Sequence, residues 1–267
     1  MLRLPFAQID AFAEQRFSGN PAAVIPLERW PSDTVLQAIA EENNLSETAY
    51  IVPASVDDVD ADFSLRWFTP TAEVALCGHA TLAAGHYVLS ADKARGQVRF
   101  RTTQSGILSV SREGEEYALA LPAWAPAAKP LPGVIAALGI NRPAQSFWHE
   151  RGYALIIVET EAMVRLLQPD MRALEAQGPM VVIVSARGTQ ADIVSRVFVP
   201  AYGVDEDPVT GSAHAVMVPY WANVLERCTF SAFQASKRGG KLRCTLDKDK
   251  AILSGKCVTV IEGEFLL

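Results

Sequence analysis

Short apolar runs alternate with amphipathic segments along this chain, and the alternation follows the same order twice. The first half reads as strand, helix and strand over residues 22–25, 32–42 and 50–52. The second half reads the same way over residues 155–158, 161–176 and 181–184. Strand runs of three or four apolar residues next to segments with helical spacing predict an α/β arrangement in each half.

A second repeated feature lies downstream of these elements. Residues 65–70 and 195–200 look like strands that end at a proline, 130 positions apart. Beyond each proline a glycine opens a helix-like segment, in Cys-Gly-His-Ala at 77–80 and in Thr-Gly-Ser-Ala at 210–213. Any α/β protein can contain similar short strands, but the coordinated order of strand, proline and glycine favours an internal repeat. We therefore expect two homologous halves.

Several strands look like members of hairpins. Residues 97–103 and 107–112 flank a Gln-Ser-Gly turn, and a further strand follows at 117–121. Consecutive hairpins do not fit a doubly wound parallel sheet. The pattern predicts an α/β (α+β) fold of two pseudo-symmetric domains, each with a mixed sheet rolled around a central helix.

The domain boundary is expected at a proline-rich stretch near the middle of the chain, because proline interrupts helices and central strands. We expect an N-terminal domain over residues 1–121, a crossover over 122–132 and a C-terminal domain over 133–257. The last strand, near residues 258–267, is a candidate to complete the first domain.

Charge and apolar content narrow the function classes. The chain has 24 Lys and Arg against 30 Asp and Glu, a formal net charge of −6. Nucleic-acid and anionic-membrane partners depend on clustered positive charge, so neither is expected. The longest aliphatic runs have five residues, against the roughly 20 of a membrane span, and no secretory signal is evident.

The four cysteines form no CxxC pair. We expect free thiols and a cytoplasmic protein.

Glu47 is the first candidate for chemistry. It follows an amphipathic segment and directly precedes an apolar strand. A carboxylate at such an edge is partly desolvated and can both accept and donate a proton. The alternative is an ordinary solvated glutamate in a loop.

His79 is the second candidate, in the first turn of a helix opened by Gly78. The free backbone N–H groups of a helix start attract anions, so His79 would face a bound anion. The alternative is a packed histidine with no role in catalysis.

Asp207 lies in a third segment, Asp-Glu-Asp at 205–207, which leads into the second glycine-opened helix. Three carboxylates suggest metal ligands, but the next candidate ligand is His214, and neither an EF-hand nor an HExxH spacing is present. No metal is expected. Nucleophile-elbow, phosphate-loop and dinucleotide-binding motifs are also absent from the sequence, so no cofactor is expected.

Together these segments resemble the PhzF-like family of phenazine biosynthesis. The resemblance runs through Asp-Ala-Phe at 10–12, Gly-Asn-Pro-Ala-Ala-Val at 19–24, Asn-Leu-Ser-Glu-Thr at 44–48, Phe-Thr-Pro-Thr-Ala-Glu-Val at 68–74 and Cys-Gly-His-Ala-Thr at 77–81. It continues through Gly106, Phe-Val-Pro at 198–200, Glu-Asp-Pro-Val-Thr-Gly-Ser-Ala at 206–213 and Lys-Arg-Gly-Gly at 237–240.

The resemblance implies a fold related to diaminopimelate epimerase, a site in the cleft between two domains, and a homodimer. It implies cofactor-independent isomerase chemistry, in which a proton moves between carbons of a small carboxylate such as trans-2,3-dihydro-3-hydroxyanthranilate. The catalytic residues it implies are Glu47, His79, Asp207 and Ser212. The expected substrate-binding positions, through backbone N–H groups at the two helix starts, are Gly78, Ala80, Gly211 and Ala213.

Two alternatives remain open. Related racemases use one cysteine from each domain, and Cys77 occupies the first of these places, but Thr210 occupies the second and a hydroxyl does not ionise near neutral pH. The other alternative is a protein that binds a small carboxylate without turnover. Retention of all four expected catalytic residues argues against it.

Overall fold

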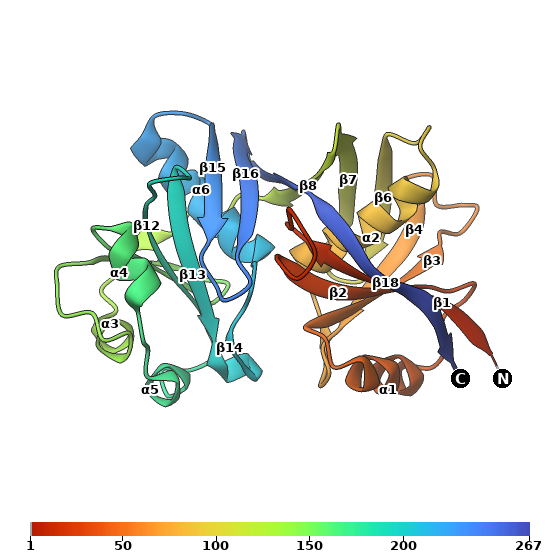
Figure 1. Ribbon diagram of the computed structural model, residues 1–267, viewed down its shortest axis with the longest axis horizontal. Coiled ribbons are helices and arrows are strands. Elements are labelled where there is room, and N and C mark those ends of the chain that lie inside the picture. Colours follow the sequence, from red (N-terminus) through yellow and green to blue (C-terminus); the bar gives the residue numbers. More distant parts are fainter. Residues whose placement is uncertain (1) are drawn as a thin grey trace. The chain divides into compact units, whose positions relative to one another are not determined.

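The computed structural model describes residues 2–267 and divides the chain into two compact units. Unit 1 contains the chain up to Ala120 together with Ser254–Leu267, and unit 2 contains Leu121–Leu253 (Figure 1). The chain thus leaves unit 1 once and returns to it with its last strand.

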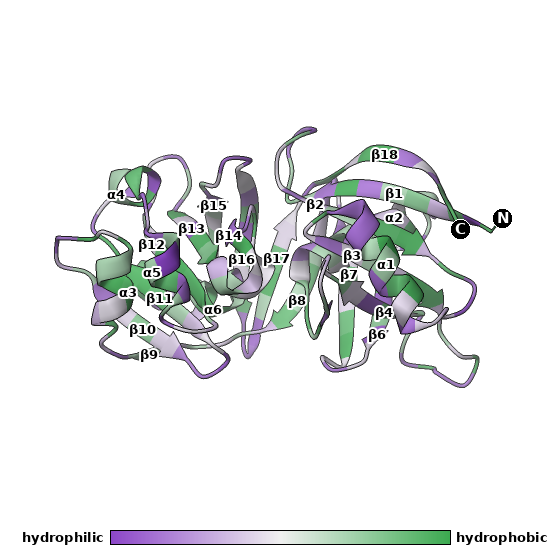
Figure 2. Ribbon diagram, turned by 90° about the horizontal axis from the view of Figure 1, so that it is seen from below, coloured by the Kyte–Doolittle hydropathy of each residue, from purple (hydrophilic) through white to green (hydrophobic). Residues whose placement is uncertain are grey.

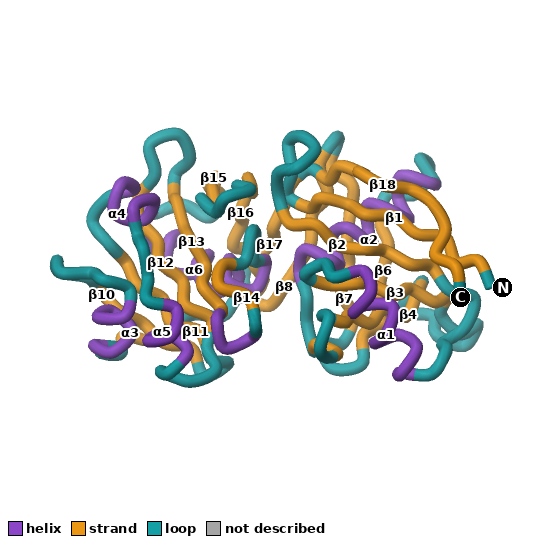
Figure 3. Tube along the Cα trace, turned by 60° about the horizontal axis from the view of Figure 1, so that its bottom comes forward, coloured by secondary structure: helices purple, strands orange, loops and turns teal. Residues whose placement is uncertain are grey.

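Unit 1 consists mainly of strands, which run side by side in Figure 3. Its strands are β1 (Arg3–Ala11), β2 (Asn20–Pro26), β3 (Glu47–Pro53), β4 (Phe63–Phe68), β5 (Glu73–Val74), β6 (Gln97–Thr102), β7 (Ile107–Glu113), β8 (Glu116–Pro122) and β18 (Cys257–Leu266). Its helices are α1 (Asp33–Asn43) and α2 (Gly78–Ala91). The last strand, β18, pairs antiparallel with β1. Apolar and polar residues alternate along both strands (Figure 2).

Unit 2 has the same kinds of elements. Its strands are β9 (Ala127–Ala128), β10 (Gln145–His149), β11 (Tyr153–Ile157), β12 (Val181–Arg187), β13 (Ile193–Val199), β14 (Val204–Glu206), β15 (Thr229–Gln234), β16 (Gly240–Asp247) and β17 (Lys250–Gly255). Its helices are α3 (Pro132–Ala137), α4 (Glu161–Leu166), α5 (Met171–Glu175), the 3-10 helix η1 (Pro200–Tyr202) and α6 (Gly211–Leu225).

Strand pairing confirms the internal repeat. In unit 1, β2 is parallel to β3, β3 antiparallel to β4, β4 parallel to β6, and β6 antiparallel to β7. In unit 2, β11, β12, β13, β15 and β16 pair in the same sequence of parallel and antiparallel ladders. The two units are therefore copies of one mixed α/β topology.

Each unit encloses one helix among its strands. The eight residues from Gly78 to Gly85 of α2 are all buried, and α2 packs against β1, β2, β3, β6, β7 and β18. In α6 the six residues from Ala213 to Val218 are buried. A helix that is apolar all round must be covered on every side, which explains why the strands roll around these two helices.

Pro219 lies inside α6, where its ring removes one backbone N–H donor. The carbonyl oxygen left without its usual helical partner is that of Ala215, four residues earlier. The backbone N–H of Trp124 donates to this oxygen at 3.0 Å. The proline-rich segment thus satisfies the acceptor that the proline exposes.

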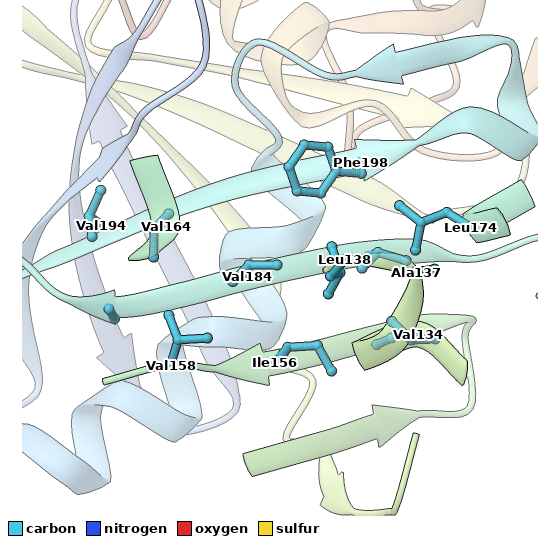
Figure 4. Packing of buried hydrophobic residues seen from close by; sticks show 13 residues of the cluster. Val134, Ala137, Leu138, Ile156, Val158, Val164, Leu174, Val184, Val194 and Phe198 are labelled. Carbon is cyan, nitrogen blue, oxygen red and sulfur yellow. The ribbon is translucent and has the colours of Figure 1, made fainter. Parts of the chain in front are cut away.

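One apolar cluster of unit 2 lies between β11, β12 and β13 on one side and α3, α4 and α5 on the other, as Figure 4 shows. The sequence predicted a single helix over residues 161–176, and this prediction is wrong. Pro169 disfavours helical backbone at the residue before it, so the chain forms two short helices. The Asp170 side chain caps the second helix by accepting the Ala173 N–H at 3.0 Å.

Among residues 2–267, no helix combines the length and apolar character that crossing a bilayer requires.

Close packing of α2 predicts that Gly85→Ala destabilises the protein. A Cβ atom at Gly85 would lie 2.4 Å from Cγ1 of the fully buried Val110. We expect the free energy of unfolding to fall by about 1–3 kcal/mol, as for other overpacked cores. Urea denaturation measures this. Gly96→Ala is the matched control, since nothing lies within 4 Å of its added Cβ; an equal loss in both variants would contradict the packing argument.

Candidate active site

The first group of polar side chains, called site 1, comprises Asn20, Ser46, Glu47, Cys77 and His79, all in unit 1. Asn20 and Glu47 begin the parallel strands β2 and β3, in which Ala22 is paired with Glu47. Parallel strands start at the same edge of a sheet, so the two side chains come close although 27 positions separate them. The start of α2 brings Cys77 and His79 to the same edge.

Asn20 follows a turn that requires glycine. Gly19 has φ +67°, and a Cβ there would lie 2.2 Å from the carbonyl oxygen of Ala11. The buried Asp10 carboxylate holds the preceding residues by accepting the Phe17 N–H at 2.8 Å. The turn therefore fixes where Asn20 enters site 1.

Glu47 and His79 form the central contact of site 1. Glu47 Oε2 lies 3.1 Å from His79 Nε2, and the two side chains are 18% and 5% exposed. Neither atom is hydrogen-bonded to any further group among the described residues. A carboxylate that is mostly buried yet still reaches solvent can exchange a proton with a small molecule.

Asn20 and Ser46 orient the imidazole from its other side. Asn20 Nδ2 lies 3.2 Å from His79 Nδ1, and the Ser46 hydroxyl donates to Asn20 Oδ1 at 3.3 Å. In this arrangement the amide N–H donates to Nδ1, so the proton of a neutral His79 ring is on Nε2, toward Glu47. The sequence assigned no role to either residue.

Burial and neighbouring groups act in opposite directions on His79. Burial lowers its pKa, but contacts with Cys77 and Glu47 outweigh this effect and raise the pKa well above its usual value. Cys77 Sγ lies 3.5 Å from His79 Nδ1. Burial, with a contribution from the Glu47 carboxylate, raises the pKa of Cys77 to about 11. Cys77 is therefore a neutral thiol near pH 7.

Site 1 also contains the residues that could hold a metal ion. Glu47, Cys77 and His79 each offer one ligand atom, and these three atoms lie within 4.8 Å of one another. The sequence did not indicate this donor set, because only the fold brings Glu47 to the start of α2. In the acidic segment 205–207, by contrast, the Glu206 carboxylate is already bound by Arg196 in a two-point ion pair of 2.7 and 2.9 Å.

The second group, called site 2, comprises Asp207, Thr210, Ser212 and Gln234, all in unit 2. The Thr210 hydroxyl donates to Asp207 Oδ2, and Thr210 N donates to Gln234 Oε1 at 2.9 Å. The buried Gln234 side chain also donates to the Asp207 carbonyl oxygen at 2.7 Å. These bonds fix the turn that leads into α6.

Ser212 lies in the first turn of α6, between the buried residues Gly211 and Ala213. Its hydroxyl has no hydrogen-bond partner in the part of the chain that the structure describes. Gly78 and Ala80 have the matching place at the start of α2. Each helix start thus offers backbone N–H groups that the helix itself does not use.

The structure brings the predicted residues together in two sets: Glu47, His79, Gly78 and Ala80 in unit 1, and Asp207, Ser212, Gly211 and Ala213 in unit 2. Cys77 and Thr210 occupy the equivalent N-cap positions of α2 and α6. Asn20, Ser46 and Gln234 were not predicted as site residues from the sequence. A glycine–asparagine–proline turn was the available signal for Asn20, and a glutamine ending an apolar strand was the signal for Gln234.

His214 is hydrogen-bonded to the backbone of Thr210 in site 2. It is fully buried, and its Nδ1–H donates to the Thr210 carbonyl oxygen at 2.8 Å. Burial lowers its pKa to about 4, and burial with the charge of Arg112 lowers that of His86 to about 4. Both rings are therefore neutral near pH 7.

These lowered pKa values predict a loss of stability on acidification. The unfolded chain binds protons at His86 and His214 below about pH 6.5, whereas the folded chain binds them only near pH 4. Their stabilising effect is present above pH 6.5 and is lost as the pH falls toward 4. We expect NMR titration, assigned with His86→Gln and His214→Gln, to show both rings neutral at pH 5.5. Titration of either ring near pH 6.5 would contradict the burial argument.

Comparison with known proteins gives one family. The family model for PhzC-PhzF, described as phenazine biosynthesis-like protein, matches residues 9–263. An uncharacterized isomerase of Pseudomonas aeruginosa is 43% identical over 267 residues, covering 100% of both chains. A PhzF-family crystal structure from Enterococcus faecalis has a TM-score of 0.91 at 41% identity, covering 100% of both chains.

A more distant structure shares the fold alone. A predicted epimerase from Pseudomonas aeruginosa has a TM-score of 0.75 at 19% identity and covers 99% of both chains. The fold is thus the epimerase-like one that the resemblance implied, and it has the two mixed-sheet halves that the repeated sequence pattern predicted. On the match across residues 9–263 and the full-length relatives, the chain belongs to the phenazine biosynthesis-like (PhzC-PhzF) family.

Proposed function

We propose that this protein is a cofactor-independent isomerase that moves a proton between two carbons of a small carboxylate substrate. The observation that carries the proposal is the contact between Glu47 and His79 in site 1, where a half-buried carboxylate lies 3.1 Å from an enclosed imidazole. The relative named as an isomerase and the epimerase-like fold support the same class of reaction.

Glu47 is the proposed acid and base. Its carboxylate accepts a proton from one substrate carbon, and the electrons of that C–H bond shift into the adjoining double bonds. The same carboxyl group then returns the proton to a second carbon, where a new C–H bond forms. The substrate is neither oxidised nor reduced, so the step balances without a redox partner.

His79 is a positioning residue for Glu47 in this proposal. Its Nε2 faces the carboxylate, while its Nδ1 is occupied by Asn20 and Cys77. A proton on Nε2 stabilises the ionised carboxylate before the reaction and steadies its orientation. The nearly complete burial of the ring keeps this partner in place.

Binding of a substrate carboxylate is assigned to a helix start. In unit 1 the unused N–H groups near Gly78 and Ala80 suit an anion. In unit 2 those near Gly211 and Ala213 do the same, the Ser212 hydroxyl adds a donor, and Asp207, held by Thr210, suits an amino group. Trans-2,3-dihydro-3-hydroxyanthranilate carries a carboxylate and an amino group.

A racemase that uses Cys77 is the second candidate, because the thiol lies 3.5 Å from His79. Two features weigh against it. The pKa of Cys77 is raised to about 11 by burial and by Glu47, and its counterpart in unit 2 is Thr210 rather than a second thiol. Binding of a small carboxylate without turnover is the non-enzymatic alternative.

Replacing Glu47 tests the proposal. With trans-2,3-dihydro-3-hydroxyanthranilate in D2O, we expect deuterium at a substrate carbon by NMR, at a rate that falls about 10²–10⁴-fold in Glu47→Gln, the range for loss of an acid/base group. Glu42→Gln changes an exposed glutamate nearby and serves as the control, with an unchanged rate.

Other outcomes separate the alternatives. Exchange at the α-carbon of an amino acid that survives Glu47→Gln but is lost in Cys77→Ala would replace the proposal with a racemase. Binding of the carboxylate with no exchange at any carbon would support the non-enzymatic alternative.

A further inference from the structure

Site 1 combines three different metal-ligand types in an enclosed place. Cys77 supplies a thiol, His79 an imidazole and Glu47 a carboxylate, each offering one atom within 4.8 Å of the others. Side chains of Cys77 and His79 are buried, and Glu47 is 18% exposed, which leaves one side open to solvent. Three protein ligands and one open position are the donor number of zinc sites that keep an exchangeable ligand.

One distance in site 1 is near that between two ligands of a tetrahedral ion. With bond lengths of about 2.0–2.3 Å, ligand atoms around zinc lie about 3.3–3.8 Å apart. Glu47 Oε2 lies 3.1 Å from His79 Nε2, whereas Cys77 Sγ lies 3.5 Å from the other ring nitrogen, Nδ1. One ligand atom of each residue lies within 4.8 Å of the others, so side-chain rotation has to bring Sγ and Nε2 to the same ion.

Two of the donor atoms face each other and make no hydrogen bond. Glu47 Oε2 and His79 Nε2 are buried 3.1 Å apart, and neither has a hydrogen-bond partner among residues 2–267. Buried polar atoms are normally hydrogen-bonded, and a bound ion is one explanation for atoms that are not. This observation is independent of the clustering of the three residue types.

Asn20 supplies the outer contact that a histidine ligand requires. A metal-bound imidazole donates its other N–H to an oxygen, which fixes the ring. When Nε2 binds the ion, Nδ1–H faces Asn20 at 3.2 Å. Rotation of the amide places Oδ1 toward Nδ1 and Nδ2 toward Ser46, whose hydroxyl can accept as well as donate.

We propose that Glu47, Cys77 and His79 form a binding site for a zinc-class divalent cation, and that occupancy of this site blocks the acid/base carboxylate. Thiol and imidazole ligands select Zn²⁺ or Co²⁺ over Mg²⁺ or Ca²⁺. On binding, the Cys77 thiol releases its proton to solvent and coordinates as the thiolate. The blocking of Glu47 rests on the proposed isomerase function, whereas cation binding does not.

Cobalt provides a direct readout. We expect anaerobic titration of the chelator-treated full-length protein with Co²⁺ to give a near-ultraviolet thiolate-to-cobalt absorption band that saturates at one ion per chain, and Zn²⁺ to displace it. The band should be lost in Cys77→Ser. It should persist in Cys228→Ser, which removes the exposed cysteine and serves as the control.

Two further variants test the ligand set without relying on the cysteine. Asn20→Ala should weaken Co²⁺ binding about 10–100-fold through loss of the outer contact, and Glu47→Gln should weaken it at least as much. Circular dichroism of each variant shows whether it is folded. No thiolate band in the unaltered protein, or a band that survives Cys77→Ser, would overturn the site.

The inhibitory effect is measured, for each variant, as the ratio of its deuterium-exchange rates without and with Zn²⁺. We expect Zn²⁺ to slow deuterium exchange in the unaltered protein and to have at least about tenfold less effect in Cys77→Ser, whatever the basal rate of that variant. If the cobalt band is present but Zn²⁺ does not affect exchange, the proposed blocking of Glu47 is wrong, whereas the proposed cation site stands. If no substrate shows exchange, the cobalt titration still decides the site.

Discussion

Enclosure of α2 and α6 by strands is the constraint on which the rest of the structure depends. Both helices are apolar on all sides, so each must be covered completely, and the mixed sheet of each unit provides that cover. A helix enclosed in this way can meet solvent or a ligand only at its ends. The chemistry-bearing residues therefore gather at the helix starts, where Cys77 and Thr210 are the N-caps.

A repeated ion pair holds the segment before each of these starts. Arg66 binds Glu73 at 2.7 Å through two nitrogens, and Arg196 binds Glu206 at 2.7 and 2.9 Å in the same manner. The two arginines also stack on Phe68 and Phe198, at 5.1 and 4.9 Å. Two-point pairing restricts both position and angle. Each pair thus fixes the short strand, β5 or β14, that leads into a helix start.

The sequence predicted the repeated strands and both glycine-opened helices, because these depend on local patterns. The eight candidate site residues remain a prediction, in which the family resemblance supplied the catalytic set. Contacts within the sites depend on strand register, which no local pattern reveals. Glu47 lies near Asn20 because β2 and β3 are parallel and begin at one edge, and it meets His79 because the start of α2 lies at the same edge. The orientation of His79 Nε2 toward Glu47 is a contact of this kind, which the sequence did not indicate. The split between α4 and α5 was predictable from Pro169, but a continuous helical spacing obscured it.

Labelled substrate tests the central claim, that one carboxyl group both removes and returns the proton, most directly. Trans-2,3-dihydro-3-hydroxyanthranilate carrying deuterium at the donor carbon would be converted in H2O under single-turnover conditions. Because Glu47 is largely shielded from water, the account predicts that part of the deuterium reaches the acceptor carbon of the same molecule. Complete loss of the label to solvent, at a rate unchanged in Glu47→Gln, would contradict it.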